Sequence, residues 1–178
     1  MSKVTTRQLV FMALCLAFGL FAKSIVSPVT NAVTDFFRIP GGSAAMGFSL
    51  AFLIIGKQIA PLPWAASAMG FVQSLLALGL GMSSYQGAFV LITYTLPGIV
   101  VDLVYPVFRN QRSYFCFFSG ILSCLSGAFA SNVLVFHLRG LPCLLWLLLG
   151  ALSGAVGGYC AYLISERLYV ITKKEVGI

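Results

Sequence analysis

Six apolar stretches alternate along the chain with short segments that contain proline, glycine or charged residues. Each stretch is close to the roughly 20 apolar residues that an α-helix needs to cross the hydrocarbon core of a bilayer. The breaks between them carry the residue types that end helices. The sequence therefore predicts one all-α domain over residues 1–178, a polytopic membrane protein with six transmembrane helices. The predicted spans are residues 8–27, 44–60, 62–82, 86–107, 114–138 and 142–168.

One connection between the spans is longer than the others. The second and third spans meet at Pro61-Leu62-Pro63, and the fourth and fifth meet at Arg109-Asn110-Gln111-Arg112, which predicts two tight hairpins. Residues 28–43 form the longer connection and contain apolar side chains that argue against disorder. Long connections in compact proteins are usually functional lids or disordered linkers. We therefore expect residues 28–43 to form a structured outer loop over the ends of the helices.

The composition excludes a water-soluble protein. Of the 178 residues, 60% are hydrophobic and only 8% are charged, whereas a soluble domain carries about 25% charged residues. The first apolar run has Lys23 where a signal peptide would place its small-residue cleavage site, so we expect a retained helix. These features predict a multi-pass protein of the cell membrane, because little of the chain is left to form a soluble domain.

The basic residues lie at the ends of the predicted spans and indicate the orientation. With the N-terminus in the cytoplasm, eight of them lie inside and three outside, and the positive-inside rule favours this arrangement over its inverse. Both termini would then be cytoplasmic. The inside residues are Lys3, Arg7, Lys57, Arg109, Arg112, Arg167, Lys173 and Lys174, and the outside residues are Lys23, Arg38 and Arg139.

The residue types that catalysis requires do not assemble in this sequence. No serine has a plausible histidine and acid partner, and there are no paired catalytic carboxylates, metal-ligand spacings or phosphate-binding glycine loops. The five cysteines lie inside apolar stretches without C-x-x-C spacing, which is typical of packing residues. We therefore predict neither enzyme activity, nor a cofactor, nor a metal. The chain also lacks an ATP-binding module, so active transport would need energy from another protein.

Small residues recur at four-residue spacing on three of the predicted helices. Such rows allow helix backbones to approach closely in a membrane. On the fifth and sixth helices we interpret them as packing within the bundle. On the first helix the row is flanked by large apolar residues, and its partner helix is either internal or part of another protein. The rows are Ser123, Gly127 and Ser131; Gly150, Gly154 and Gly158; and Ala13 and Ala17.

Lys23 and Asp102 are ionisable residues that lie within the predicted spans. Lys23, near the outer end of the first span, has a stem long enough to snorkel to the interface. Asp102 lies inside Val100-Val101-Asp102-Leu103-Val104, where an unpaired carboxylate is costly. An internal ion pair or partner contact and a role in transport both explain Asp102, and the sequence does not decide between them.

Polar and aromatic residues gather toward the outer ends of the predicted spans. Together they would line a substrate pocket with apolar walls and a few oriented polar groups, whereas an interfacial aromatic belt explains only Tyr85 and Trp146. A vitamin-like heterocycle would use hydrogen bonds from Asn132 and Thr93. A tetrapyrrole would use His137 as an axial ligand, unless His137 is a solvated helix cap. The candidate substrate-binding residues are Asn31, Asp35, Arg38, Tyr85, Gln86, Thr93, Tyr94, Asn132, His137, Arg139 and Trp146.

The whole chain resembles the substrate-binding S components of energy-coupling-factor (ECF) transporters, a class of ABC importers. The resemblance rests on the length, the six helices, the long outer loop and the start Thr5-Thr6-Arg7-Gln8-Leu9, which leads into Ala13-x-x-x-Ala17. It implies that Ala13 and Ala17 pack on the coupling helices of a T component. The segments Arg38–Gly42 and Tyr94–Asp102 look like those of uncharacterised or thiamine-precursor-related S components.

The resemblance implies a high-affinity subunit that binds a vitamin or another cofactor or cofactor precursor. Its partners would be a T component, two ATPase subunits, the small-molecule substrate and the bilayer, with no role for nucleic acid. A haem- or tetrapyrrole-specific S component is one alternative. An autonomous six-helix transporter or channel is another, although the sequence shows no inverted repeat and only Asp102 could couple an ion at depth.

Overall fold

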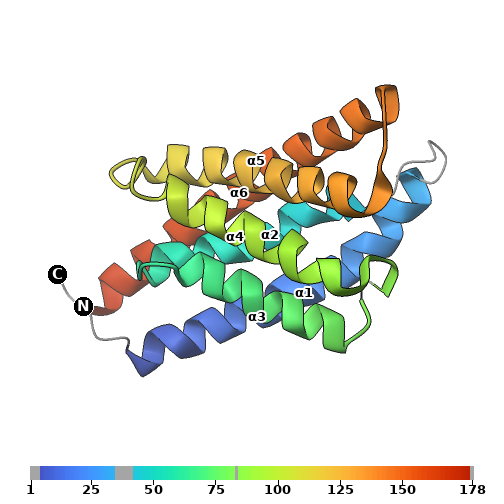
Figure 1. The fold of residues 1–178 in the computed structure, drawn as a ribbon. Helices are drawn as coiled ribbons and strands as arrows, with labels where there is room; N and C mark the ends of the chain where they lie inside the picture. The colour runs from blue at the N-terminus through green and yellow to red at the C-terminus, as the bar shows by residue number, and fades with distance from the viewer. Residues whose placement is uncertain (1–4, 35–41, 83, 177–178) are drawn as a thin grey trace.

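The computed structural model describes residues 5–34, 42–82 and 84–176 of the chain, which fold into six α-helices. Figure 1 shows these helices side by side as one elongated bundle. A 3₁₀-helix precedes α4 and a π-helical turn follows α5. The helices are α1 (Thr6–Thr34), α2 (Gly42–Ile59), α3 (Ala65–Gly79), α4 (Val90–Val104), α5 (Arg112–Ser131) and α6 (Leu141–Val176), with the short helices η2 (Ser84–Phe89) and η3 (Asn132–Phe136). The prediction of an all-α, six-helix chain is confirmed.

Helix α1 begins and helix α6 ends at the same end of the bundle, as Figure 1 shows. We call this the terminal end and the opposite end the distal end. Helix α2 lies at the centre and contacts each of the other five helices. This arrangement fits the prediction that both ends of the chain lie on one side of a membrane.

Four of the helical segments are long and apolar enough to cross a membrane: Thr6–Ala32, Gln86–Val104, Arg112–Phe136 and Leu141–Leu168. The apolar parts of α2 and α3, Ala45–Ile59 and Ala65–Gly79, are shorter. At 1.5 Å per residue, a 15-residue helix reaches about 22 Å of a hydrocarbon core that is about 30 Å thick. Among the described residues, four of the six predicted spans therefore have a continuous apolar segment of full length, and α2 lies among its neighbours at the centre of the bundle.

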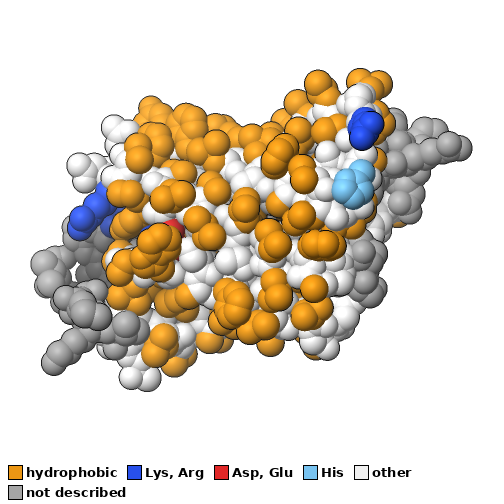
Figure 2. Space-filling model, viewed as in Figure 1, with side chains coloured by type: hydrophobic (Ala, Val, Ile, Leu, Met, Phe, Trp, Pro, Cys, Tyr) orange, Lys and Arg blue, Asp and Glu red, His pale blue; other side chains and the backbone are white. Residues whose placement is uncertain are grey.

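The outside of the bundle is apolar. Figure 2 shows hydrophobic side chains spread over the side of the molecule, while the visible Lys and Arg side chains lie toward its two ends. Phe21 and Val29 of α1 are each 64% exposed, and Leu152 of α6 is 57% exposed. Exposed apolar surface on this scale is unsuited to water and suits a surround of lipid chains.

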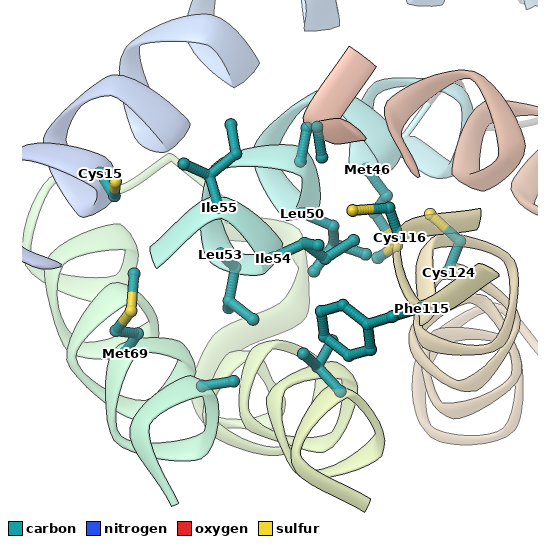
Figure 3. Packing of buried hydrophobic residues seen from close by; sticks show 14 residues of the cluster. Cys15, Met46, Leu50, Leu53, Ile54, Ile55, Met69, Phe115, Cys116 and Cys124 are labelled. Carbon is teal, nitrogen blue, oxygen red and sulfur yellow. The ribbon is translucent and has the colours of Figure 1, made fainter. Parts of the chain in front are cut away.

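The interior is built around α2. Figure 3 shows Leu53 and Ile54 of this helix enclosed by side chains from other helices, among them Met69 of α3 and Phe115 of α5. The cysteines contribute small packing groups, since Cys15, Cys116 and Cys124 are buried and all five cysteines are free. The predicted packing role of the cysteines fits this arrangement.

Glycines allow α6 to pack directly on the backbones of two neighbouring helices. A Cβ atom on Gly154 would overlap the carbonyl oxygen of Gly120 on α5, and one on Gly157 would overlap that of Gly47 on α2. The predicted packing of the small-residue rows within the bundle is therefore confirmed on α5 and α6. Every member of these two rows is buried: Ser123, Gly127, Ser131, Gly150, Gly154 and Gly158.

The expected outer loop over residues 28–43 differs from the structure, because α1 continues through Pro28 to Thr34 and α2 already begins at Gly42. The remainder, residues 35–41, lies outside the described residues. Pro28 has no backbone N–H to donate to the Ser24 carbonyl four residues before it. Nearby hydroxyl groups bond other carbonyls of the same helix, with Ser24 Oγ donating to the Leu20 carbonyl and Thr30 Oγ1 to the Val26 carbonyl, both at 3.1 Å. Proline is more frequent inside membrane helices than inside soluble ones.

Candidate functional site

A cluster of polar side chains lies inside the distal half of the bundle, where α1, α2, α3 and α4 meet. These side chains and a few apolar ones enclose a cavity of about 10 Å³, close to the smallest space that holds one water molecule. We call Lys23, Ser49, Gln73, Gln86, Thr93 and Tyr94 the polar cluster. Lys23, Ser49, Gln73, Thr93 and Tyr94 line the cavity itself, with Met46, Leu50 and Pro97 as its apolar wall.

Lys23 of α1 turns into the bundle rather than out to the membrane interface, so the expected snorkelling is wrong. Its ammonium donates a hydrogen bond to the Tyr94 hydroxyl and lies 4.1 Å from the centre of the Tyr94 ring. Tyr94 is only 7% exposed. A cation over the face of an aromatic ring is stabilised by the negative potential of that face. This contact joins Lys23 of α1 to Tyr94 of α4.

Gln73 of α3 is the member of the cluster without a complete set of partners. The residue is 3% exposed, and its Nε2 has no hydrogen-bond partner among the residues that the structure describes. A Cβ atom on Gly19 would lie 3.5 Å from this nitrogen, so the amide reaches the backbone of α1. A buried donor left unsatisfied costs about 1–3 kcal/mol. Such a group in a folded protein calls for an explanation.

Thr93 and Gln86 tie the start of α4 to the preceding 3₁₀-helix. Thr93 Oγ1 donates to Gln86 Oε1 at 3.2 Å and is also 3.3 Å from the Val90 carbonyl oxygen. Both side chains are buried. The structure thus brings three predicted site residues together, Gln86, Thr93 and Tyr94, and adds Lys23, Ser49 and Gln73, which the sequence analysis did not include. A lone amide in the apolar third span was the available signal for Gln73.

Asn132 of the predicted site holds the turn between α5 and α6. Its Nδ2 donates to the Leu138 carbonyl at 3.3 Å and to Cys143 Sγ at 3.2 Å, and its Oδ1 accepts from the Leu138 amide at 2.8 Å. The His137 amide donates to the Asn132 carbonyl at 2.7 Å. Because these bonds engage both ends of the amide, Asn132 has a structural role in this state.

Trp146 is also engaged within the bundle. Its indole donates to the Ala128 carbonyl at 2.9 Å, the residue is 1% exposed, and its ring lies 5.1 Å from the ring of Phe136. His137 and Arg139 are exposed, and His137 adopts the left-handed conformation with φ 50°. The turn that carries them meets the 3₁₀-helix before α4, since η2 and η3 are in contact.

The remaining predicted site residues are only partly described. Asn31 is exposed near the distal end of α1, and it has an interaction partner. Asp35 and Arg38 lie outside the described residues. Tyr85 belongs to η2, but its side chain is not described. The assignment of these four residues to a substrate site stays a prediction.

Asp102 forms an internal ion pair toward the terminal end of the bundle. Its Oδ1 lies 2.5 Å from Lys57 Nζ, and both side chains are buried. The carboxylate also accepts from the backbone amides of Ala66 and Ser67, at 3.3 and 2.7 Å. These amides belong to the first turn of α3, where backbone donors have no intrahelical partners and negative charge is favourable. The sequence left an internal ion pair, a partner contact and a transport role open for Asp102, and the structure shows the internal ion pair.

Ala13 and Ala17 lie on the outside of α1. Both are exposed, as are their neighbours Leu14 and Phe18, which are 50% and 56% exposed. Helix α1 packs on α2 and α3 through its opposite side. Ala13 and Ala17 therefore do not pack against another helix of this bundle. Of the two neighbours considered for the row, a helix of another protein is the one that stays open.

The chain matches no family model, no curated protein and no solved structure. Its class follows from the fold and the surface. Over the residues that the structure describes, it is an all-α protein with several long apolar helices, four of them long and apolar enough to cross a membrane, and this architecture is compatible with a multi-pass membrane protein.

Proposed function

We propose that this chain is the substrate-binding S component of an ECF-type importer, with six membrane helices and both ends in the cytoplasm. In this role it captures a vitamin, or another cofactor or cofactor precursor, at the outer face of the cell membrane. A T component and two ATPase subunits supply the energy. The distal end of the bundle is then the outer end, and the terminal end faces the cytoplasm.

The observation that carries this proposal is the position of Ala13 and Ala17 on the outward side of α1. Two alanines one helical turn apart, between exposed large side chains such as Leu14 and Phe18, leave a shallow strip into which another helix can settle. Close packing of this kind drives helix association in lipid. The strip matches the alanine motif of the S components, which supports a protein partner rather than lipid alone.

The polar cluster supports a binding function. It lies between four helices in the distal half, it lines a small cavity, and it contains the Gln73 amide, whose Nε2 has no hydrogen-bond partner among the described residues. Ligand sites combine apolar walls with a few oriented polar groups, and Tyr94 adds an aromatic face to the set. No comparable feature favours an autonomous carrier, because Asp102 is held by Lys57 and by the start of α3.

Co-purification tests the proposal. The tagged chain is extracted from its native membranes in mild detergent, and the accompanying proteins are quantified by mass spectrometry. We expect a helical membrane protein and two ATPases in fixed proportion to the chain. Substrate uptake by vesicles that contain only the purified chain would show an autonomous transporter and contradict the proposal.

A further inference from the structure

Two side chains of the polar cluster, Lys23 and Gln73, bring several hydrogen-bond donors to its cavity. The Lys23 ammonium has three donors, and the hydrogen bond given for it goes to the Tyr94 hydroxyl. The Gln73 amide has two donors on Nε2, with no partner among the described residues. The Ser49 hydroxyl donates to the Met46 carbonyl at 3.4 Å. Among the described residues, the donors on Gln73 Nε2 therefore still call for an acceptor.

Among the residues that the structure describes, the lining of the cavity also carries no negative charge. None of the side chains that line it from α1, α2, α3 or α4 is acidic. The chain has four Asp and Glu residues. Among those whose side chains the structure describes, Asp102 is paired with Lys57, and Glu166 lines a different pocket, which it shares with Arg112 at the terminal end. A lysine at membrane depth is costly without a counter-charge, and no described residue is recorded as supplying one to Lys23, so a negative group is the partner that this site favours most.

We infer that the ligand of this protein carries a carboxylate, which Lys23 Nζ and Gln73 Nε2 bind inside the polar cluster. This inference rests on the proposed binding function and names the chemical class of its substrate. Hydrogen bonds from an ammonium to a carboxylate are about twice as strong as neutral ones, and a carboxylate also gives the Gln73 donors an acceptor. The cavity has room for about one oxygen atom, so a larger ligand enters by separating Lys23 from Tyr94.

Two pairs of probes test the charge requirement without knowledge of the natural ligand. Acetate and acetamide differ mainly in charge, as do nicotinate and nicotinamide. Thermal unfolding of the purified protein in detergent is followed with each probe at constant ionic strength. We expect the two acids to raise the unfolding temperature at millimolar concentrations, the range for a weak single-group contact, and the two amides to leave it unchanged. Equal shifts for acid and amide, or no shift with either acid, would overturn the inference.

Variants of Lys23 and Gln73 test whether the acids bind in the polar cluster. Lys23→Gln and Gln73→Leu should weaken the response to acetate by about tenfold or more, while Arg109→Gln, at an exposed position outside the polar cluster, should leave it as in the parent. A response to acetate that survives in both donor variants would also overturn the inference. It would place the anion elsewhere.

A third variant keeps the test decisive if either substitution prevents folding. Gln73→Glu puts a carboxylate beside Lys23 within the chain itself. We expect this variant to fold, to unfold at a higher temperature than the parent, and to lose the response to acetate. A Gln73→Glu protein that unfolds at a lower temperature than the parent, or still responds to acetate, would count against the inference.

These outcomes are separate from those that test the importer proposal. If the T component and ATPases co-purify but the acids have no effect, the importer assignment stands and its substrate is not held by a carboxylate. If the acids bind through Lys23 and Gln73 but no partner proteins accompany the chain, the anion site stands and the importer assignment fails.

Discussion

Lys57 Nζ of α2 lies 2.5 Å from Asp102 Oδ1 of α4, and both side chains are buried. Lys57 also donates to the Leu62 carbonyl at 2.7 Å, and Asp102 also accepts from the Ser67 hydroxyl at 2.6 Å. The pair thus fixes three elements to one another: the end of α2, the start of α3 and the last turn of α4. Its additional hydrogen bonds satisfy the groups that a buried ion pair would otherwise leave open.

Removing one partner of this pair should strongly destabilise the protein. Asp102→Asn or Lys57→Met leaves an uncompensated buried charge, which typically costs about 3–5 kcal/mol. The double variant Lys57→Met/Asp102→Leu should recover part of that loss, because no charge remains unpaired. Thermal unfolding in detergent measures both effects, with the exposed Arg109→Gln as control. Single variants as stable as the Arg109→Gln control would show that the ion pair has no structural role.

A second prediction concerns the contact between α2 and α6. Gly157→Ala should reduce the yield of folded protein, because the new Cβ meets the backbone carbonyl of Gly47, which cannot turn away as a side chain can. Overpacking of a close contact costs about 1–3 kcal/mol. Gly79→Ala is the matched control, since nothing lies within 4 Å of its Cβ position. Size-exclusion profiles and unfolding temperatures compare the two variants, and equal behaviour would mean that the helices do not approach as described.

The row on α1 predicts a separation between binding and uptake. Replacing Ala13 and Ala17 with Trp should reduce uptake in cells by about tenfold or more, because a filled strip prevents close helix approach. Binding of ligand to the purified chain should stay close to that of the parent. Leu152→Trp on the exposed side of α6 is the control and should leave both quantities unchanged. Loss of binding together with uptake would show that the row supports the fold rather than a partner.

The turn after α5 predicts a structural role for Asn132. Asn132→Ala removes three hydrogen bonds from this turn and should lower the unfolding temperature, by the equivalent of about 1–3 kcal/mol for the unsatisfied groups. His137→Gly should be tolerated, because glycine adopts the left-handed conformation of this position without strain. A haem-binding protein would instead lose its Soret absorption with His137→Gly. If Asn132→Ala weakens ligand binding without changing stability, Asn132 belongs in the substrate site.

Much of the fold follows from the sequence, because apolar runs and their proline, glycine and charged breaks mark helices directly. The run through Pro28 was the exception, because proline usually marks the end of a helix but is found more often inside membrane helices. The helix therefore extends to Thr34.

The candidate site was less predictable than the fold. Gln86, Thr93 and Tyr94 were found because polar groups near helix ends are conspicuous in an apolar chain. Lys23 and Gln73 were missed because the sequence does not show which way a side chain on a helix faces. The partners of Asn132 depend on how the chain folds back after α5, and they too are visible only in three dimensions.

The most direct test of the central claim is mass spectrometry of the small molecules retained by the protein after mild purification from cells. We predict one organic acid in an amount equimolar with the chain, absent from Gln73→Leu and retained by the exposed control Arg109→Gln. A small molecule retained equally by all three proteins would place binding outside the polar cluster. Purified protein that carries no small molecule and transports solute by itself in vesicles would contradict the account of this chain as a binding subunit.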